Sequence, residues 1–223
     1  MTDTPDPKAP VTGAEVLAAG LDDWRLLFRA IHARYRTGDL ATGLRFAQRV
    51  GEAADAANHH PDLDLRYGHV EVRLRSHDVG AITSRDLALA ATISTIAAES
   101  GLDAEPAELR LLDLALDTAE AAQIMPFWAA VLGYVPSGQG DEVVDPGGTR
   151  PGLWFQGTDA HEEPRQRFHL DVFVPHDVVE ERIAEAIAAG GTLVDDSEAP
   201  SFWVLADAQG NKACFCTWQD AAD

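Results

Sequence analysis

The sequence of 223 residues lacks two features that would place it in a special class of protein. It has only two cysteines, Cys214 and Cys216, which excludes a framework of several disulfides. The two lie two positions apart in a segment with a strand pattern, so both should point to one face. No apolar run reaches the roughly 20 residues that a membrane-spanning helix needs. Together these absences favour a soluble protein in a reducing, cytoplasmic location.

Basic residues are also scarce. Lys and Arg number 17 against 37 Asp and Glu, a formal net charge of −20. A surface of that sign repels phosphate backbones and anionic lipids, so neither a nucleic acid nor a membrane is expected as a partner. Residues 1–105 contain 16 acids and 11 bases, whereas residues 106–223 contain 21 acids and 6 bases. This asymmetry indicates two units of different character.

The first unit is predicted to span residues 12–102 and to be an α+β domain. Its alternating and helical hydrophobic patterns predict helices and paired strands in turn. Paired strands separated by helices favour an antiparallel sheet covered by helices. The predicted helices follow Thr12, Asp39 and Thr83, and the predicted strands cover Trp24–Leu27, Ala30–Arg36, Leu63–Arg66 and Val70–Arg75.

The second unit is predicted to span residues 107–219, after a linker at residues 102–106. A strand, a helix and three short strands occur twice in about 115 residues. The first helix is expected over Ala119–Leu132 and the second over Val178–Ala189. The pattern therefore predicts paired βαβββ modules.

Three histidines of the first unit form the strongest candidate site. His59 and His60 lie at the exit of a helix, and His77 follows a strand that can fold back toward it. Imidazoles titrate near neutrality and suit proton transfer. Asp55 lies one helical turn before His59 and could orient a ring. Other interpretations remain open: a solvated surface loop, or zinc ligands.

Two neighbouring residues have ordinary explanations as well. Asp86 completes a capping box that opens with Thr83. Tyr67 is in keeping with an aromatic residue on a strand. The residue types alone therefore do not settle the role of either side chain.

The spacing of these residues resembles the signature of the pterin-4a-carbinolamine dehydratases. In that family an acid precedes His-His-Pro, followed by an aromatic residue, a further histidine and a later Asp. The matching positions are Asp55, His59, His60, Pro61, Tyr67, His77 and Asp86. The resemblance covers roughly residues 20–100. Asn58 and Leu63 depart from the pattern, because an acid and an aromatic residue often occupy these places.

The resemblance implies a hydro-lyase that converts 4a-hydroxytetrahydrobiopterin, or a related pterin, to the quinonoid dihydropterin and water without metal or cofactor. His59 and His77 match the general acid/base residues, and His60 matches a catalytic histidine that contacts the pterin. Asp86 matches a catalytic-site residue that supports one of these histidines. Asp55, Pro61 and Tyr67 match substrate-binding positions. The family likeness also implies a homo-oligomer.

The second unit resembles a glyoxalase-like, vicinal-oxygen-chelate domain. The segments that carry this likeness are Phe127–Tyr134 and Asp207–Lys212. In metal-using members a strand histidine is a ligand, which His169 matches, and a Glu follows the Gly-Asn pair, where this chain has Lys212. The metal site therefore looks incomplete, and no metal is expected. His169 is otherwise interpreted as a half-buried strand residue. A cavity lined by Trp154, Phe155, His169 and Trp203 is expected between the modules.

The sequence thus predicts a two-domain enzyme, with a dehydratase first and an auxiliary domain second. One alternative is a non-catalytic dimerisation, regulatory or small-molecule-binding protein. Another is a metal-dependent glyoxalase or dioxygenase. The complete set of histidines disfavours the first alternative, and Lys212 disfavours the second.

Overall fold

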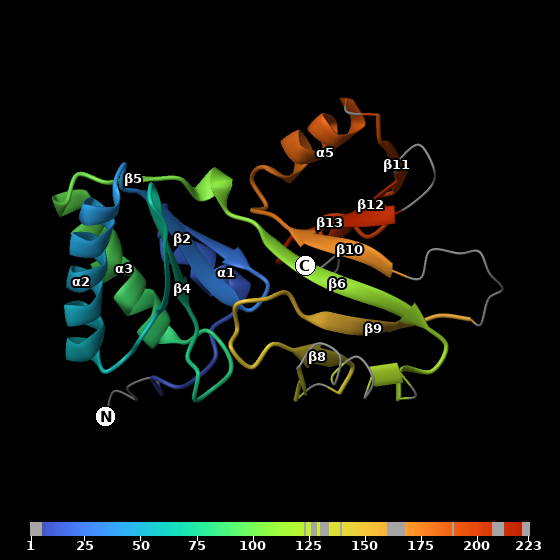
Figure 1. Ribbon diagram of the computed structural model, residues 1–223, viewed down its shortest axis with the longest axis horizontal. Helices are drawn as coiled ribbons and strands as arrows, with labels where there is room; N and C mark the ends of the chain where they lie inside the picture. Colours follow the sequence, from blue (N-terminus) through green and yellow to red (C-terminus); the bar gives the residue numbers. More distant parts are fainter. Residues whose placement is uncertain are drawn as a thin grey trace. The chain divides into compact units, whose positions relative to one another are not determined.

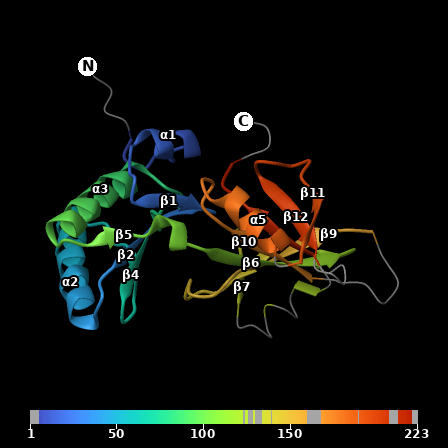
Figure 2. The ribbon, with the colours of Figure 1, turned by 90° about the horizontal axis from the view of Figure 1, so that it is seen from above.

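The computed structural model describes residues 6–122, 124–125, 129, 134–138, 140–159, 168–188, 190–206 and 212–219. The chain forms two compact units, residues 1–109 and 110–223, drawn in Figures 1 and 2. Among the helices of the described residues, none combines the length and the apolar character needed to cross a bilayer.

The first unit is an antiparallel sheet with helices, as the sequence predicts. Its strands have the order β1-β2-β4-β3, with β5 added on β2, and every pair is antiparallel. The elements are α1 (Gly13–Ala18), β1 (Trp24–Leu27), β2 (Ala30–Arg36), α2 (Leu40–Ala57), β3 (Asp62–Leu65), β4 (His69–Leu74), α3 (Ser84–Glu99), β5 (Asp103–Ala104) and the 3₁₀ turn η1 (Pro106–Glu108).

Helices α2 and α3 lie side by side on one face of this sheet (Figures 1 and 2). The alternation of β2 and β4 turns every second side chain toward them. Tyr35 of β2 packs edge-on against Phe46 of α2, with ring centroids 5.2 Å apart. The buried core between the layers includes Ile31, Ala33, Val50, Val70, Val72, Leu74, Leu89 and Ile93.

Side chains at the helix starts fix where α2 and α3 begin. The Asp39 carboxylate accepts a hydrogen bond from the Thr42 N–H at 2.7 Å and caps α2. The Thr83 hydroxyl and the Asp86 carboxylate form the predicted capping box of α3. Since the capping box sets the position of Asp86, it also fixes part of the site described below.

The linker prediction for residues 102–106 is wrong in part. Asp103 and Ala104 form β5 by pairing with Arg36 and Tyr35. The Glu105 carboxylate lies 3.2 Å from Nε of Arg34 and reinforces this attachment. A two-residue strand has no periodicity of its own, so its sequence does not reveal it.

The second unit has an eight-stranded sheet in the order β11-β12-β13-β10-β6-β9-β8-β7. Its second half has the predicted strand–helix–three-strand order. The elements are β6 (Leu111–Thr118), β7 (Val135–Pro136), β8 (Glu142–Val144), β9 (Leu153–Gly157), β10 (Phe168–Phe173), α5 (Val179–Ala188), β11 (Thr192–Asp195), β12 (Phe202–Ala206) and β13 (Lys212–Cys216).

Some predictions for this unit fall on residues outside the described ones. Of the helix expected over Ala119–Leu132, residues 121, 122, 124, 125 and 129 are described and helical. Most of the segment Phe127–Tyr134 and nearly all of Asp207–Lys212 lie outside the described residues.

The prediction of one shared cavity in the second unit is wrong for the side chains expected to line it, which are Trp154, Phe155, His169 and Trp203. Phe155 packs in a core with Leu116 and Leu153, and Trp203 packs against a second core that includes Ile183. Trp154 stands on the opposite face of the sheet, where it meets His169 edge-on with centroids 6.1 Å apart. Successive strand residues point to opposite faces, so Trp154 and Phe155 cannot line one cavity.

Candidate active site

The exit of α2 places His59 inside the first unit. Asn58 ends the helix in the left-handed region with φ 46°, and its N–H donates to the carbonyls of Ala54 and Asp55. Asparagine tolerates this conformation better than most residues. The turn separates the two adjacent histidines, so that His59 is 7% exposed while His60 lies at the surface.

His59 forms a buried pair with Asp86. Nε2 of the His59 ring lies 2.7 Å from Oδ1 of Asp86. Asp86 is fully buried. The other oxygen, Oδ2, accepts from the Ser76 hydroxyl at 2.7 Å and from the Thr83 N–H at 2.8 Å. A carboxylate oxygen can only accept, so Nε2 of His59 carries the proton of this bond. The pair therefore fixes the ring and leaves Nδ1 as its proton acceptor.

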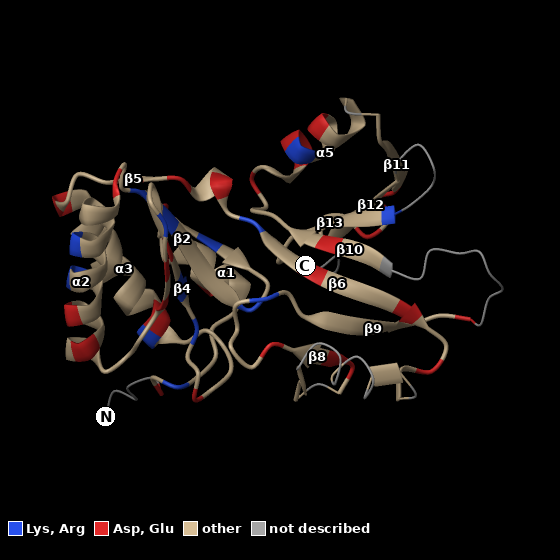
Figure 3. Cartoon of the chain, viewed as in Figure 1, with Lys and Arg blue, Asp and Glu red and all other residues tan. Residues whose placement is uncertain are grey.

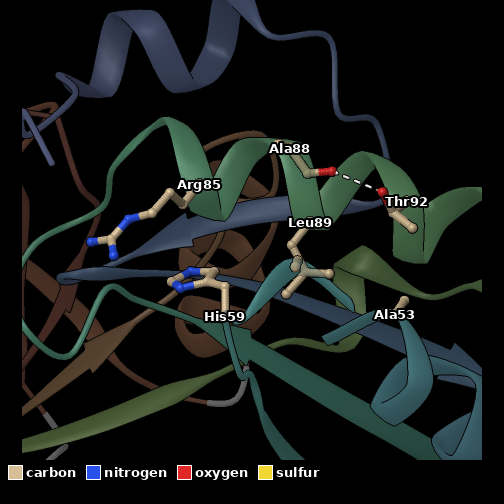
Figure 4. A pocket seen from close by; sticks show the side chains of 7 residues that line it. Ala53, His59, Arg85, Ala88, Leu89 and Thr92 are labelled. Carbon is tan, nitrogen blue, oxygen red and sulfur yellow. Dashed lines mark hydrogen bonds between the residues drawn. The ribbon is translucent and has the colours of Figure 1, made fainter. Parts of the chain in front are cut away.

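A cavity of about 220 Å³ lies beside this pair. Its lining combines small and apolar side chains from two helices with two polar groups at one end: Ala53, Ala57, His59, Arg85, Ala88, Leu89 and Thr92. Figure 4 shows His59 below the first turns of α3, with Arg85 above it and Leu89 further along. An apolar cavity with few polar groups is the usual make-up of a small-molecule site.

Arg85 is held in place by its own partners. Its guanidinium lies 2.8 Å from Asp78, and its Nε donates to the Thr83 hydroxyl at 3.3 Å. Lys8 lies 2.9 Å from the same aspartate. Hydrogen bonds from Arg85 and Lys8 lower the pKa of Asp78, and the bond to Asp78 raises the pKa of Arg85. The polar end of the cavity thus contains a fixed positive charge.

The other predicted site residues lie nearer the surface. His60 Nε2 is 3.1 Å from Oδ1 of Asp55, and both side chains are more than half exposed. His77 is 65% exposed, with Nε2 4.0 Å from Oδ2 of Asp62. Tyr67 is 75% exposed and Pro61 is half-buried. None of these residues lines the cavity beside His59.

Chain connectivity nevertheless ties His77 to the same place. It directly follows Ser76, whose hydroxyl donates to Asp86, so its Cα lies about 3.8 Å from that of a residue in contact with the pair. Its neighbour Asp62 is two residues beyond His60. The residue types alone gave no signal for Ser76 or Arg85, because a serine at a strand end and an arginine on a helix are common.

The second unit has a polar cluster on the face of its sheet opposite the helix-packed core. His169 lies between two carboxylates, with Nδ1 3.4 Å from Asp117 and Nε2 3.4 Å from Asp171. These neighbours raise the pKa of His169, chiefly because the ring N–H donates a hydrogen bond to the Asp171 carboxylate. Burial raises the pKa of Cys214 to about 12, and burial also raises that of Cys216. His169 is half-buried, as one of its two sequence interpretations states.

The first unit is therefore an α+β domain with a buried histidine–carboxylate pair beside a cavity, an arrangement suited to acid–base chemistry. Residues 9–96 match the family Pterin 4 alpha carbinolamine dehydratase, and residues 113–216 match the family Glyoxalase-like domain. The chain belongs to the pterin-4-alpha-carbinolamine dehydratase family, with a glyoxalase-like domain joined to it.

Two relatives are named as members of the same family, and one solved structure is also similar to the chain. A provisionally named pterin-4-alpha-carbinolamine dehydratase of Chloroflexus aurantiacus is 40% identical over 74 residues, which are 33% of this chain and 80% of that protein. One of Halobacterium salinarum is 44% identical over 69 residues, 31% of this chain and 76% of that protein. A crystal structure described as a transcriptional coactivator/pterin dehydratase from Brucella melitensis is 28% identical, with a TM-score of 0.38, and the match covers 40% of this chain and 99% of that one.

Proposed function

We propose that the first unit dehydrates 4a-hydroxytetrahydrobiopterin, or a related 4a-hydroxytetrahydropterin, to the quinonoid dihydropterin and water. The family assignment makes the chain a hydro-lyase. The observation that carries the proposal is the buried His59–Asp86 pair at the polar end of an apolar cavity.

The reaction needs one proton delivered and one removed. The C4a–O bond breaks, and the departing hydroxyl takes up a proton and leaves as water. The N5–H bond gives its proton to a base, and its electron pair forms the N5=C4a double bond. A positioned acid and a positioned base each contribute typically 10²- to 10⁴-fold to such a step.

His59 is suited to one of these two transfers. Its Nδ1 is available because Nε2 is bound to Asp86. When the ring takes up a proton, the carboxylate stabilises the resulting positive charge at 2.7 Å in a buried setting. Asp86 is a positioning residue in this account, since it acts through His59.

We assign the second transfer to His77, next to Ser76, and a role in pterin contact and proton transfer to His60. Asp55, Pro61 and Tyr67 are proposed to contact the substrate from the more exposed side. The fixed guanidinium of Arg85 supports a ligand that presents acceptor atoms to this end of the cavity, as the carbonyl and ring nitrogens of a pterin do.

A dehydration assay on purified variants tests the proposal. His59→Gln keeps an amide N–H that can donate to Asp86 but cannot carry a proton to or from the substrate. His59→Gln and His77→Ala should each lower kcat on the order of 10²-fold or more. His69→Ala is the matched control, because this strand histidine lies at the opposite end of β4 from Ser76 and His77. Unchanged turnover in both test variants would refute the assignment.

A further inference from the structure

The polar cluster of the second unit is built from three neighbouring strands. Asp171 of β10 faces Cys214 of β13 in parallel register, and His169 stands two residues earlier on the same face. Figure 3 shows acidic positions on the adjacent strands β6 and β10. One ligand atom each from His169, Asp171 and Cys214 lies within 4.8 Å of the other two.

One pair in this cluster already has the separation that a transition-metal site requires. Zinc binds thiolate at about 2.3 Å, and imidazole and carboxylate at about 2.0–2.2 Å, in tetrahedral geometry. Such bonds require ligand atoms to lie about 3.3–3.8 Å apart. Nε2 of His169 and Oδ1 of Asp171 are 3.4 Å apart already. The separations to Cys214 are within 4.8 Å, so binding of three donors to one ion requires the longest separation to shorten by at most about 1.5 Å.

The surrounding groups are also arranged as the outer shell of a metal site. Nδ1 of His169 faces Asp117 at 3.4 Å, so that carboxylate can hold the ring when a metal replaces the contact of Nε2 with Asp171. Oδ1, the Asp117 oxygen that faces the ring, is buried and has no other hydrogen-bond donor among the described groups. The Trp154 indole donates to Oδ2 of Asp171 at 3.0 Å, which leaves Oδ1 for the ion. Metal-bound histidines and carboxylates commonly have such partners.

We infer that His169, Asp171 and Cys214 bind one zinc-class transition-metal ion, with Asp117 and Trp154 orienting two of the ligands. A thiolate beside an imidazole favours zinc or cobalt over magnesium or calcium, which prefer oxygen ligands alone. Three protein ligands leave a fourth position open for water or a small molecule. This site replaces the sequence-based expectation of an incomplete one, and it is independent of the reaction proposed for the first unit.

Cobalt spectroscopy on the full-length chain tests this inference with a direct readout. With a net charge of −20, surface carboxylates will also bind divalent ions weakly, so total metal content is not decisive. A thiolate-to-cobalt charge-transfer band reports only ions in contact with sulfur. Under reducing conditions, titration of the metal-stripped protein with Co²⁺ should give this band at one ion per chain. Zn²⁺ should abolish the band by displacement, and excess Mg²⁺ should not.

The two cysteines supply a matched pair of variants. Cys216 lies on the same face and is equally buried, but is not part of the three-residue cluster. Cys214→Ser should abolish the band, and Cys216→Ser should retain it. Asp117→Asn should keep the band but weaken cobalt binding about 10- to 100-fold, the usual effect of losing an outer-shell partner.

Thermal melting of each metal-free variant shows whether it is folded. If Cys214→Ser does not fold, His169→Ala replaces it, because this ligand is only half-buried; it should weaken cobalt binding and the band with it. Absence of the band in the folded wild-type chain would overturn the inference. A band that survives Cys214→Ser, or that depends on Cys216 instead, would also overturn it.

Discussion

Replacement of Asp86 by asparagine separates the two roles of this side chain. As a capping residue, Asp86 accepts from the Thr83 N–H and the Ser76 hydroxyl through Oδ2. As a positioning residue, it accepts from Nε2 of His59 through Oδ1. An asparagine can keep the first role with its amide oxygen, but its NH₂ group then faces His59.

The amide reverses the hydrogen bond to the ring. An NH₂ donor requires a lone pair on Nε2, so the His59 proton moves to Nδ1 and the ring can no longer accept a proton there. We expect kcat to fall about 10²- to 10⁴-fold, equivalent to about 2.7–5.5 kcal/mol of activation free energy. Exchanging charge-assisted for neutral hydrogen bonds should cost about 1–3 kcal/mol of unfolding free energy.

The assay is steady-state dehydration at 25 °C, with urea unfolding of the same preparation. Asp39→Asn is the matched control, because it makes the same chemical change at the start of α2. Helix α2 has 18 residues and is therefore about 27 Å long. Asp39 lies at its start, whereas His59 follows its opposite end. Asparagine caps as well as aspartate, and the control should stay within about 0.5 kcal/mol and near full turnover. A folded Asp86→Asn protein with turnover within about threefold of wild type would show that Asp86 is only a cap.

Two further outcomes follow from the same structure. Burial lowers the pKa of His32 to about 3, and its Nε2 is buried without a hydrogen-bond partner among the described groups. In the unfolded chain the His32 ring takes up a proton near pH 6.5, whereas in the folded chain it stays neutral to about pH 3. The His32 contribution to the free energy of unfolding is therefore fully present above pH 6.5 and is lost as pH falls. At pH 5 the loss is at most about 2 kcal/mol. The urea midpoint should fall less between pH 7.5 and pH 5 for His32→Gln than for the wild-type protein. An equal fall in both proteins would contradict the lowered pKa of His32. Chelation should leave dehydratase turnover unchanged, because both oxygens of Asp86 are occupied and the pair offers a metal only one ring nitrogen; loss of turnover on metal removal, restored by zinc, would contradict the metal-free reaction.

Local patterns predicted much of the first unit. The predicted strand pair Trp24–Leu27 and Ala30–Arg36, the second with period-2 alternation, has the bounds of the structure, and Asp39 and Thr83 marked the starts of α2 and α3. These features depend on neighbouring residues, which a sequence records directly. Strand β5 depends instead on distant pairing with β2, and its two residues resemble a linker.

The candidate site was predictable in its residue types but not in its contacts. His59 and Asp86 are 27 positions apart, and their bond depends on the turn at Asn58 as well as the capping box. In the second unit, the meeting of His169 with Cys214 depends on the parallel pairing of β10 with β13. The separation of Trp154 from Phe155, by contrast, follows from strand alternation and could have been predicted.

The most direct test of the central claim is a crystal structure of the full-length chain soaked with a dihydropterin. The account predicts the pterin ring in the cavity between α2 and α3, with N5 or the 4a position in contact with Nδ1 of His59 and the His59–Asp86 bond intact. A pterin bound elsewhere on the chain, with no contact to His59, would contradict it.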